Sequence, residues 1–437
     1  SPQLFDWTRI GNWLPYVAAE PADHAGKLVA LEGHVTHVVR RALPADSAAR
    51  LEMPAYYECA MTLNGDAGQA TILTARVPKA WLEMQSLDEP ATAAGVFIRL
   101  LSDDQQSPHG LFVSREIAWH PIAPNVPFVS LGKSTLGQLG VDVGLLDLLR
   151  HRRSITSAER EAFYQMLGAA GRIGTNQLDR FARQQLPFIA QRWAQEERAL
   201  TESAADPARL QLAREVQARA AMGLYSVAPL FNDASNQVGE LVSLEGTVRR
   251  VTPIDIDSST GGAVSDVARR FDTFRYFELD LFTDDSQNNP IVVCVRQLPP
   301  GFPLGDGLHQ PVRIAGFFFK SWSFESRRAT LPAARADSSA ADIRQIAPLL
   351  IGRSPLSLEP ANASAYDSIG AVAAPILSGR VVPATRNAVE CKAGRSPVSR
   401  IRVPRFRSLL TGQPFHRFPH GGVQCEARSG SAGFAWR

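Results

Sequence analysis

The stretch GKLVALEGHV at residues 26–35 returns as GELVSLEGTV at residues 239–248, 213 positions later. Further landmarks return in the same order, at offsets that drift only to 221. The matched pairs are Tyr56-Tyr57-Glu58 with Tyr276-Phe277-Glu278, Ala94-Gly95-Val96-Phe97 with Ala315-Gly316-Phe317-Phe318, and Arg99 with Lys320. Landmarks that recur in order at a nearly constant spacing distinguish a repeat from chance. The sequence therefore predicts that one domain has been duplicated.

Each copy alternates apolar and polar side chains, which is typical of short β-strands with one buried face. The apolar face of the first strand consists of Val29, Leu31, Gly33 and Val35 in one copy, and of Val242, Leu244, Gly246 and Val248 in the other. Later strands are expected at residues 71–77, 91–101 and 111–119, and at 290–296, 312–321 and near 343–351. Because strand side chains alternate between faces, the matched patterns predict which residues of each copy face its core.

About five strands in roughly 100 residues, with a glycine inside the first strand where a closing sheet bends, predict a small antiparallel barrel. The strand order and lengths resemble an OB-fold, and a five-stranded sandwich or another small barrel fits the same pattern. Between the copies the apolar period becomes helical, with helices expected at residues 156–171, 177–200 and 207–222. The predicted fold class is mainly β with an α insert (α+β): two OB-like five-stranded antiparallel barrels separated by a helical subdomain.

The expected domain boundaries follow from these changes of pattern. They are an N-terminal lead-in at 1–25, a first OB-like β domain at 26–125, a helical subdomain at 126–225, a second OB-like β domain at 226–354, and a disordered basic tail at 355–437. Residues 381–437 contain ten Lys and Arg against two acidic residues, a local charge of +8. Because the whole chain has a net charge of +3, the residues before 381 carry −5. A slightly acidic folded part lacks the electrostatic footprint of a nucleic-acid-binding protein.

Composition excludes several classes of protein. With 45% hydrophobic and 20% charged residues the chain is typical of a globular protein. Its four cysteines, Cys59, Cys294, Cys391 and Cys425, form no CxxC motif, so neither a zinc site nor a disulfide framework is indicated. No uninterrupted apolar stretch reaches the roughly 18 residues of a membrane span.

Three motifs that could carry chemistry are better explained by structure. Gly132-Lys133-Ser134-Thr135 resembles part of a phosphate loop, but Pro127 stands where that loop needs a glycine, so a polar turn is expected. His34 and His37 are three residues apart on a strand and therefore point to opposite faces, which disfavours a metal pair. No Ser, His and Asp set is apparent. We therefore expect no catalytic residues, no cofactor and no metal.

One outward-facing set recurs in both copies and is the candidate binding face. It comprises Tyr56, Glu58 and Arg76 in the first copy, and Tyr276, Glu278 and Arg296 in the second. OB-type ligand faces use this region, with aromatic rings that stack and basic groups that pair with a ligand. The structural alternative, a cross-strand Glu–Arg pair beneath a tyrosine, is favoured. The outward glutamates would repel a phosphate backbone, so a protein, peptide or saccharide partner is preferred to nucleic acid.

The duplicated LEG strands, together with Leu145-Leu146-Asp147 and the segment EREAFYQ at residues 159–165, resemble a group of uncharacterised bacterial proteins with a duplicated OB-fold-like β domain. This resemblance implies no activity. It does imply a membrane helix after the second copy, and hence a bacterial, membrane-associated protein tethered in its intact form. The chain departs from that pattern near Ile369, and one hypothesis is that the basic tail is translated from another reading frame.

The leading hypothesis is a non-enzymatic binding or scaffold protein whose tandem OB-like domains bind a protein, peptide or saccharide. One alternative is an enzyme of unrecognised class with its site between a barrel and the helical subdomain, where pockets often form. A second alternative is single-stranded nucleic-acid binding through stacking on Tyr56 and Tyr276.

Overall fold

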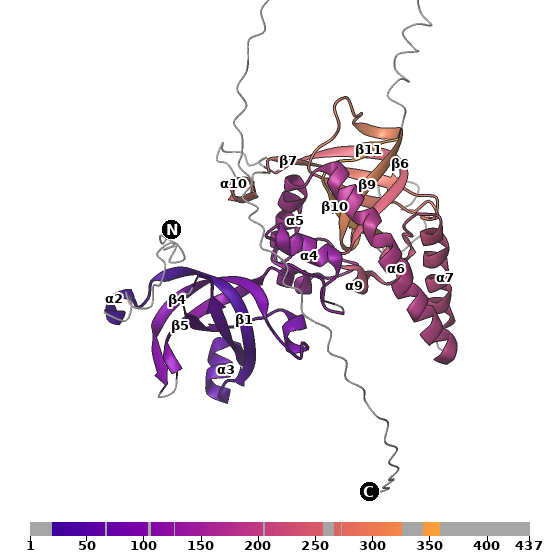
Figure 1. The fold of residues 1–437 in the computed structure, drawn as a ribbon. Coiled ribbons are helices and arrows are strands. Elements are labelled where there is room, and N and C mark those ends of the chain that lie inside the picture. The colour runs from indigo at the N-terminus through magenta and orange to yellow at the C-terminus, as the bar shows by residue number, and fades with distance from the viewer. Residues whose placement is uncertain are drawn as a thin grey trace, which may run out of the picture. The chain divides into compact units, whose positions relative to one another are not determined.

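The computed structural model describes residues 20–65, 68–103, 106–125, 127–203, 206–256, 266–271, 273–325 and 344–358 (Figure 1). Apart from residues 355–358, the predicted disordered tail lies outside these residues, as does most of the lead-in. The described elements all belong to one unit, Ser1–Val372. The secondary structure is mixed, with strands at both ends of this unit and helices between them.

The first barrel is a closed ring of five strands in the order β1-β2-β3-β5-β4, with β4 pairing back to β1. The strands are β1 (Leu28–Ala42), β2 (Ala55–Leu63), β3 (Gln69–Thr74), β4 (Glu89–Asp103) and β5 (Gln106–Trp119). All pairs are antiparallel except β3 with β5, which is parallel. The prediction of a wholly antiparallel barrel was therefore wrong. Strand directions cannot alternate all the way round a ring of five, so one neighbouring pair must be parallel.

The second ring repeats this arrangement with β6, β7, β8, β10 and β9, closed by the pairings of β9 with both β6 and β10. Its strands are β6 (Leu241–Asp255), β7 (Arg275–Phe282), β8 (Ile291–Val295), β9 (Gly305–Glu325) and β10 (Arg344–Gly352), and β11 (Leu356–Ser357) extends it along β9. Here β8 and β10 form the parallel pair. The strand expected near residues 343–351 is thus β10.

The two rings share their register as well as their order. Val29 lies opposite Gly95 in the first barrel, and the matched Val242 lies opposite Gly316 in the second ring. A one-residue irregularity interrupts the first strand at the same point of both copies, between Val35 and His37 and between Val248 and Arg250. The matched sequence patterns therefore correspond to matched positions in space, as a duplication requires.

The interior of each ring is filled by the residues that the alternation predicts. Leu31 and Leu244 are 3% and 2% exposed, and Cys59 and Leu279 on the second strands are fully buried. The outsides of the rings differ. Strand β3 alternates between buried and more exposed residues, whereas all five residues of β8, IVVCV, are buried. A continuous apolar run is typical of a strand covered on both faces, and the covering elements are helices.

Helices occupy the connections and the segment between the rings. They are α2 (Pro21–His24), α3 (Ala45–Leu51), η2 (Lys79–Leu82), α4 (Leu131–Gln138), η3 (Val143–Leu148), α5 (Arg160–Arg172), α6 (Thr175–Ser203), α7 (Pro207–Ala221), α8 (Ala228–Asn232), α9 (Ala234–Gln237) and α10 (Asp266–Phe271). The Asp206 carboxylate accepts hydrogen bonds from the backbone N–H groups of Ala208 and Arg209, which confirms the predicted start of α7. None of the described helices combines the length and apolar character of a membrane span.

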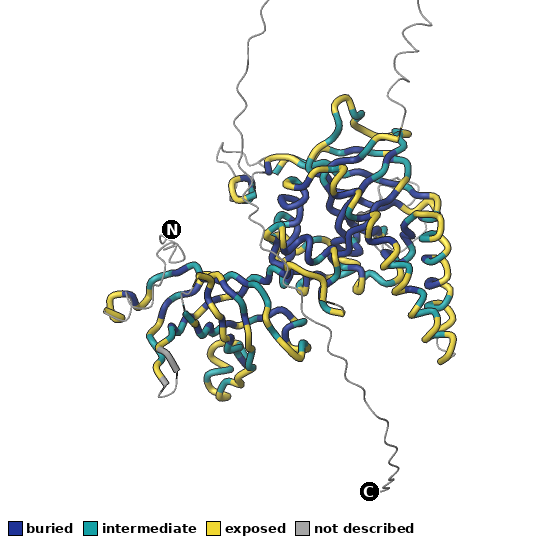
Figure 2. Tube along the Cα trace, viewed as in Figure 1, coloured by how far each residue is buried: buried dark blue, intermediate teal, exposed yellow. Residues whose placement is uncertain are grey.

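Helices α5 and α6 pack on the outside of the second ring. Helix α5 contacts β9 and β10, and α6 contacts β6 and β9 (Figure 1). Figure 2 shows the consequence: β8, most of β10, the middle of β9 and much of α5 are buried, whereas the first barrel alternates between buried and exposed segments. One copy of the duplicated unit is covered on its outer surface by helices of the same chain, and the matching surface of the other copy is half-buried to exposed.

Candidate binding face

The predicted face of the first barrel does not form the expected Glu–Arg pair. Tyr56 and Glu58 lie on β2 and are half-buried. Glu58 Oε2 accepts a hydrogen bond from Arg41 Nε at 2.9 Å, and Arg76 instead pairs with Glu116. Both pairs are partly solvent-exposed, so each stabilises the barrel only slightly. The outer surface near Tyr56 therefore carries two separate ion pairs, Arg41 with Glu58 and Arg76 with Glu116.

In the second ring the corresponding residues are engaged elsewhere. Glu278 Oε1 accepts a hydrogen bond from Arg250 at 3.2 Å, and Arg250 also pairs with Asp280 at 2.8 Å. Arg296 does not match Arg76, because the strand pairings make Arg296 the equivalent of Ala75 in the first barrel. Its side chain packs at Gly171 of α5, where an added Cβ would lie 3.3 Å from it. The arginine that recurs in the sequence is therefore not a shared position in space.

Tyr276 shows how the second face is covered. Its ring packs edge to face against Phe163 of α5, with the ring centroids 5.6 Å apart. Burial raises the pKa of the Tyr276 hydroxyl above its ordinary value. Tyr276 is thus a packing residue beneath a helix. Of the two tyrosines considered from the sequence as stacking platforms, only Tyr56 is not covered by α5.

The N-terminal end of α5 is fixed by a buried ion pair. Lys320 Nζ donates to Glu159 Oε1 at 2.7 Å, and both side chains are fully buried. Glu159 also accepts hydrogen bonds from the backbone N–H groups of Arg150 and Thr156, at 2.6 and 2.7 Å. Burial alone would raise the pKa of Glu159, but these hydrogen bonds, with that of Lys320, lower it below its ordinary value. Glu159 is therefore a charged anchor for the helix.

The opposite end of α5 is held by a second cation of the ring. Arg353 Nη1, which directly follows β10, donates to the carbonyl oxygen of Ile173 at 3.0 Å and also to that of Gly171. Unpaired carbonyls at a helix C-terminus favour a positive group. Between the two anchors the apolar side of α5 is buried, with Phe163 contacting Phe319 of β9 at a centroid distance of 5.7 Å.

The same positions on the first barrel form an uncovered face, which we call the open face. The strand pairings identify its apolar members and the residue of the second ring, beneath α5, that occupies the same position. They are Leu73 (matching Cys294), Val96 (Phe317), Ile98 (Phe319), Leu111 (Leu349) and Val113 (Ile351). Its two basic members are Arg99 and Arg115, which match Lys320 and Arg353. Ile98 and Val113 are 42% and 45% exposed. Among the described helices, only the short α2 and η3 have more than marginal contact with β4 and β5, and neither is as long as α5.

The open face continues into a shallow groove of about 570 Å³ on the outside of β1, β4 and β5. Ala94, Ser114, Arg115 and Glu116 are among the residues that line it. In the second ring the matching region lies under α6, where the Ser243 hydroxyl donates to Asp179 at 2.6 Å. The groove is therefore the part of the first barrel that corresponds to the α6-covered part of the second ring.

Sequence reasoning matched Arg99 with Lys320 but did not find the open face. Its strongest available signal was the contrast between QATILT in β3, which alternates, and IVVCV in β8, which does not. Arg115 and Val113 were missed because the last strand of the second copy has no recognisable register in the sequence. The pairing of Phe112 and Leu350 with the matched residues Phe97 and Phe318 supplies that register.

The motifs that were set aside prove to be structural. Gly132 lies in the first turn of α4, where a Cβ would meet the carbonyl oxygen of Gly239 at 2.1 Å, so a helix start stands in place of the expected polar turn. The Ser134 and Thr135 hydroxyls both donate to the carbonyl of Leu131. His34 Nδ1 lies 3.0 Å from Asp88, and no three potential metal ligands cluster among the described residues.

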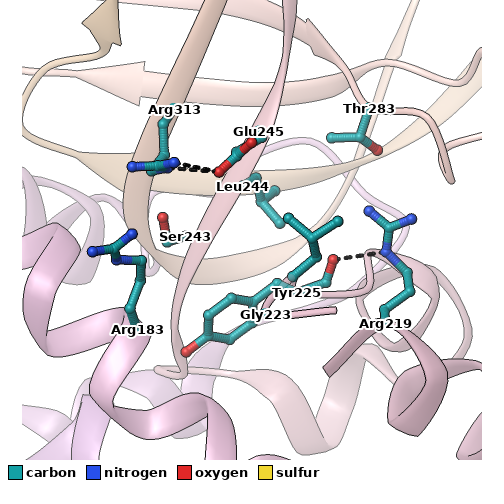
Figure 3. A pocket seen from close by; sticks show the side chains of 10 residues that line it. Arg183, Arg219, Gly223, Tyr225, Ser243, Leu244, Glu245, Thr283 and Arg313 are labelled. Atoms are coloured by element: carbon teal, nitrogen blue, oxygen red, sulfur yellow. Dashed lines mark hydrogen bonds and ion pairs between the residues drawn. The ribbon is translucent and has the colours of Figure 1, made fainter. Parts of the chain in front are cut away.

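A small pocket lies where α6, the end of α7 and strands β6 and β9 meet (Figure 3). Three arginines line it, Arg183, Arg219 and Arg313, but acidic groups compensate each of them. Arg313 pairs with Glu245, for example, and Arg219 donates to the carbonyl of Tyr225 (Figure 3). The enclosed volume of about 10 Å³ holds no more than a water molecule. The pocket is a polar junction between helices and ring.

One buried carboxyl group has a strongly shifted pKa. Asp142, 5% exposed, caps η3 and accepts hydrogen bonds from the backbone N–H groups of Trp119 and Gly144, both at 2.9 Å. Desolvation by burial raises its pKa to about 6 despite these bonds. Because Trp119 ends β5, Asp142 connects the first barrel to the segment that follows it.

Neither a protein-family model nor a curated protein matches the chain. Among solved structures, the chain is similar to a putative aspartyl-tRNA synthetase from Leishmania major Friedlin, with 9% identity, a TM-score of 0.17, and coverage of 64% of this chain and 47% of that one. An aspartyl-tRNA synthetase from Entamoeba histolytica gives 10% identity, a TM-score of 0.13, and coverage of 59% and 48%. The chain thus spans about half the length of each, and at these scores neither likeness bears on its function.

Proposed function

We propose that this chain is a non-enzymatic binding or scaffold protein in which the second ring is structural and the first barrel binds a protein or peptide partner. The observation that carries the proposal is the difference in covering. Helices of the chain bury the outside of the second ring, whereas the matching apolar positions of the first barrel, Ile98 and Val113, remain 42% and 45% exposed. Contiguous exposed apolar surface on a globular protein marks an interaction site.

The ring topology supports a ligand-binding outer face on the first barrel. The order β1-β2-β3-β5-β4, with a parallel β3–β5 pair and an irregularity in β1, is consistent with the proposed OB-like barrel. Such barrels bind their ligands on the outer face around the second and third strands. Tyr56 lies on β2, and Leu73 on β3 joins this region to the open face.

Charge supports a polypeptide partner over nucleic acid. Glu58 and Glu116 compensate Arg41 and Arg76 on the outside of the barrel, which removes two of the cations that a phosphate backbone could follow. The membrane tether and bacterial origin that the sequence resemblance implies remain expectations and take no part in this proposal.

The test is selection of ligands by the immobilised full chain from an unbiased displayed-peptide library and from a glycan array. We expect saturable binding of peptides that is lost with Val113→Asp on the first barrel. Leu304→Asp is the matched control, because Leu304 is an equally apolar residue, 55% exposed, next to β9 of the second ring.

Ligands that bind Val113→Asp as well as the unmodified chain, or bind only the second ring, would refute the assignment of binding to the first barrel. Binding of glycans alone would replace the peptide partner with a saccharide. An enzyme would instead need a cleft with convergent, uncompensated polar groups, and the pocket of Figure 3 supplies compensated ones.

A further inference from the structure

We infer that the open face of the first barrel is a docking site for one amphipathic α-helix of a partner protein, bound as α5 binds the second ring. This inference rests on the proposed function and specifies the partner. The chain itself supplies the template, because a helix already occupies the matching face of the second copy. The partner helix would lie along β5 with its N-terminus at Arg99 and its C-terminus at Arg115.

The apolar centre of the two faces is built in the same way. In the second ring, Ile351 lies between Cys294 on β8 and Phe317 on β9, and all three are buried. In the first barrel, Val113 lies between Leu73 on β3 and Val96 on β4 in the same register. Such a row of apolar side chains across three strands presents a flat surface that the apolar stripe of a helix can cover.

The irregularities of the strands are conserved between the two faces as well. Ile98 falls in the register shift between Phe97 and Arg99, at the position of Phe319, which precedes Lys320. This shift turns Phe319 toward Phe163 of α5 in the second ring. Ile98 is correspondingly turned outward in the first barrel and is 42% exposed. The open face therefore offers the same protruding apolar contact.

The charges at the two ends specify the direction and chemistry of the partner. Lys320 binds Glu159 before the first turn of α5, and Arg353 binds carbonyl oxygens at its last turn. The first barrel keeps a cation at both positions, Arg99 and Arg115, and neither side chain has an ion pair among the described residues. Arg99 is thus matched to a carboxylate at the helix N-terminus, and Arg115 to free carbonyls at the C-terminus.

The partner helix can be described from α5 itself. Besides Ala162 and Ala169, the buried apolar residues of α5 lie, counting from the anchoring glutamate, four, seven, eight and eleven positions later, at Phe163, Met166, Leu167 and Ala170. This spacing places them on one face of a helix of about three turns. The expected ligand is therefore a segment with a glutamate followed by apolar residues at these four positions.

The probe is a displayed library of 18-residue peptides with this fixed pattern and random residues elsewhere, selected against the full chain. A library with the same composition and a scrambled apolar pattern is the control. Enriched peptides are then measured by fluorescence anisotropy against three chains: unmodified, Arg99→Glu, and Arg50→Glu. Arg50 lies exposed on α3 of the same barrel and serves as the matched charge control.

We expect enrichment only from the patterned library and a loss of affinity of at least about tenfold with Arg99→Glu, because like charges then meet at the helix N-terminus. Changing the peptide glutamate to lysine should restore binding to Arg99→Glu, and Arg50→Glu should bind as the unmodified chain does. Equal enrichment from the scrambled library, or unchanged affinity with Arg99→Glu, would overturn the helix-docking site. If unbiased peptides still require Val113, the proposed function survives that result; if no peptide binds at all, both fall.

Discussion

The two copies of the duplicated unit differ in what lies outside them. Inside, matched residues such as Leu31 and Leu244 are buried to the same extent. Outside, β8 is buried on both faces beneath a helix, while β3 presents one face to solvent. The two copies therefore share an interior and differ in their outer surfaces. The proposal assigns a structural role to the second ring and binding to the first barrel, and it rests on this difference.

The ion pair beneath α5 gives the largest expected contrast. Lys320→Met would leave Glu159 charged and buried without its partner, and we expect a loss of about 3–5 kcal/mol in the free energy of unfolding. The matched change in the first barrel, Arg99→Met, should alter it by less than about 0.5 kcal/mol. Urea denaturation of the full chain measures both. Equal losses would mean that Arg99 is as buried as Lys320, contrary to an open face.

Apolar truncation compares the two exteriors next. Leu349 is 1% exposed beneath α5, so Leu349→Ala should cost about 3 kcal/mol through lost contacts and a cavity. Leu111 is its half-buried counterpart, and Leu111→Ala should cost about 1 kcal/mol. Thermal and urea denaturation again report the difference. A loss for Leu111→Ala as large as that for Leu349→Ala would show that the first exterior is covered.

Much of this contrast could be predicted from the sequence, but not its functional consequence. The alternation of apolar and polar residues identified interior residues such as Leu31 and Leu244, because the face on which a strand residue lies depends only on its position along the strand. The Asp206-Pro207 start of α7 was visible because capping is local chemistry. The open face could not be predicted, because it depends on Val113 meeting Leu73 and Val96 across three strands. It also depends on which of the two rings α5 packs against, and contacts between residues far apart in the sequence determine that packing.

The predicted binding set shows the same limit. Tyr56 and Tyr276 are equivalent in sequence and register, yet Phe163 covers only the second. Arg76 and Arg296 look equivalent in sequence and differ by one position, which moves a strand residue to the other face. Equivalence of residues in a repeat therefore does not establish equivalence of their surroundings.

Asp142 provides a pH test of the first barrel's attachment. Its pKa is raised from 3.8 to about 6 in the folded protein, so the folded state holds the proton more tightly than the unfolded one. The stabilisation from this group is full below about pH 4 and is lost as pH rises through about 6, an effect of on the order of 3 kcal/mol. Asp142→Asn keeps a carbonyl oxygen to accept both hydrogen bonds. Its stability relative to the unmodified chain should therefore rise between pH 4 and pH 7, as followed by urea denaturation. A constant difference would contradict the raised pKa.

The two buried thiols give the most local comparison of the two copies, because the labelling of each thiol reports its own surroundings. Cys59 lies inside the first barrel, and burial raises its pKa to about 12. Cys294 belongs to β8 and lies on its outer face, beneath α5. In a chain carrying Cys391→Ser and Cys425→Ser, neither thiol should react with a disulfide reagent at pH 8, because the reactive thiolate is suppressed. Adding Lys320→Met should loosen α5 and expose Cys294 while Cys59 stays protected, which mass spectrometry of the labelled chain would resolve. Simultaneous labelling of both thiols would mean that loosening α5 also opens the first barrel, so that the two copies unfold together and the covering by α5 is not local to the second ring.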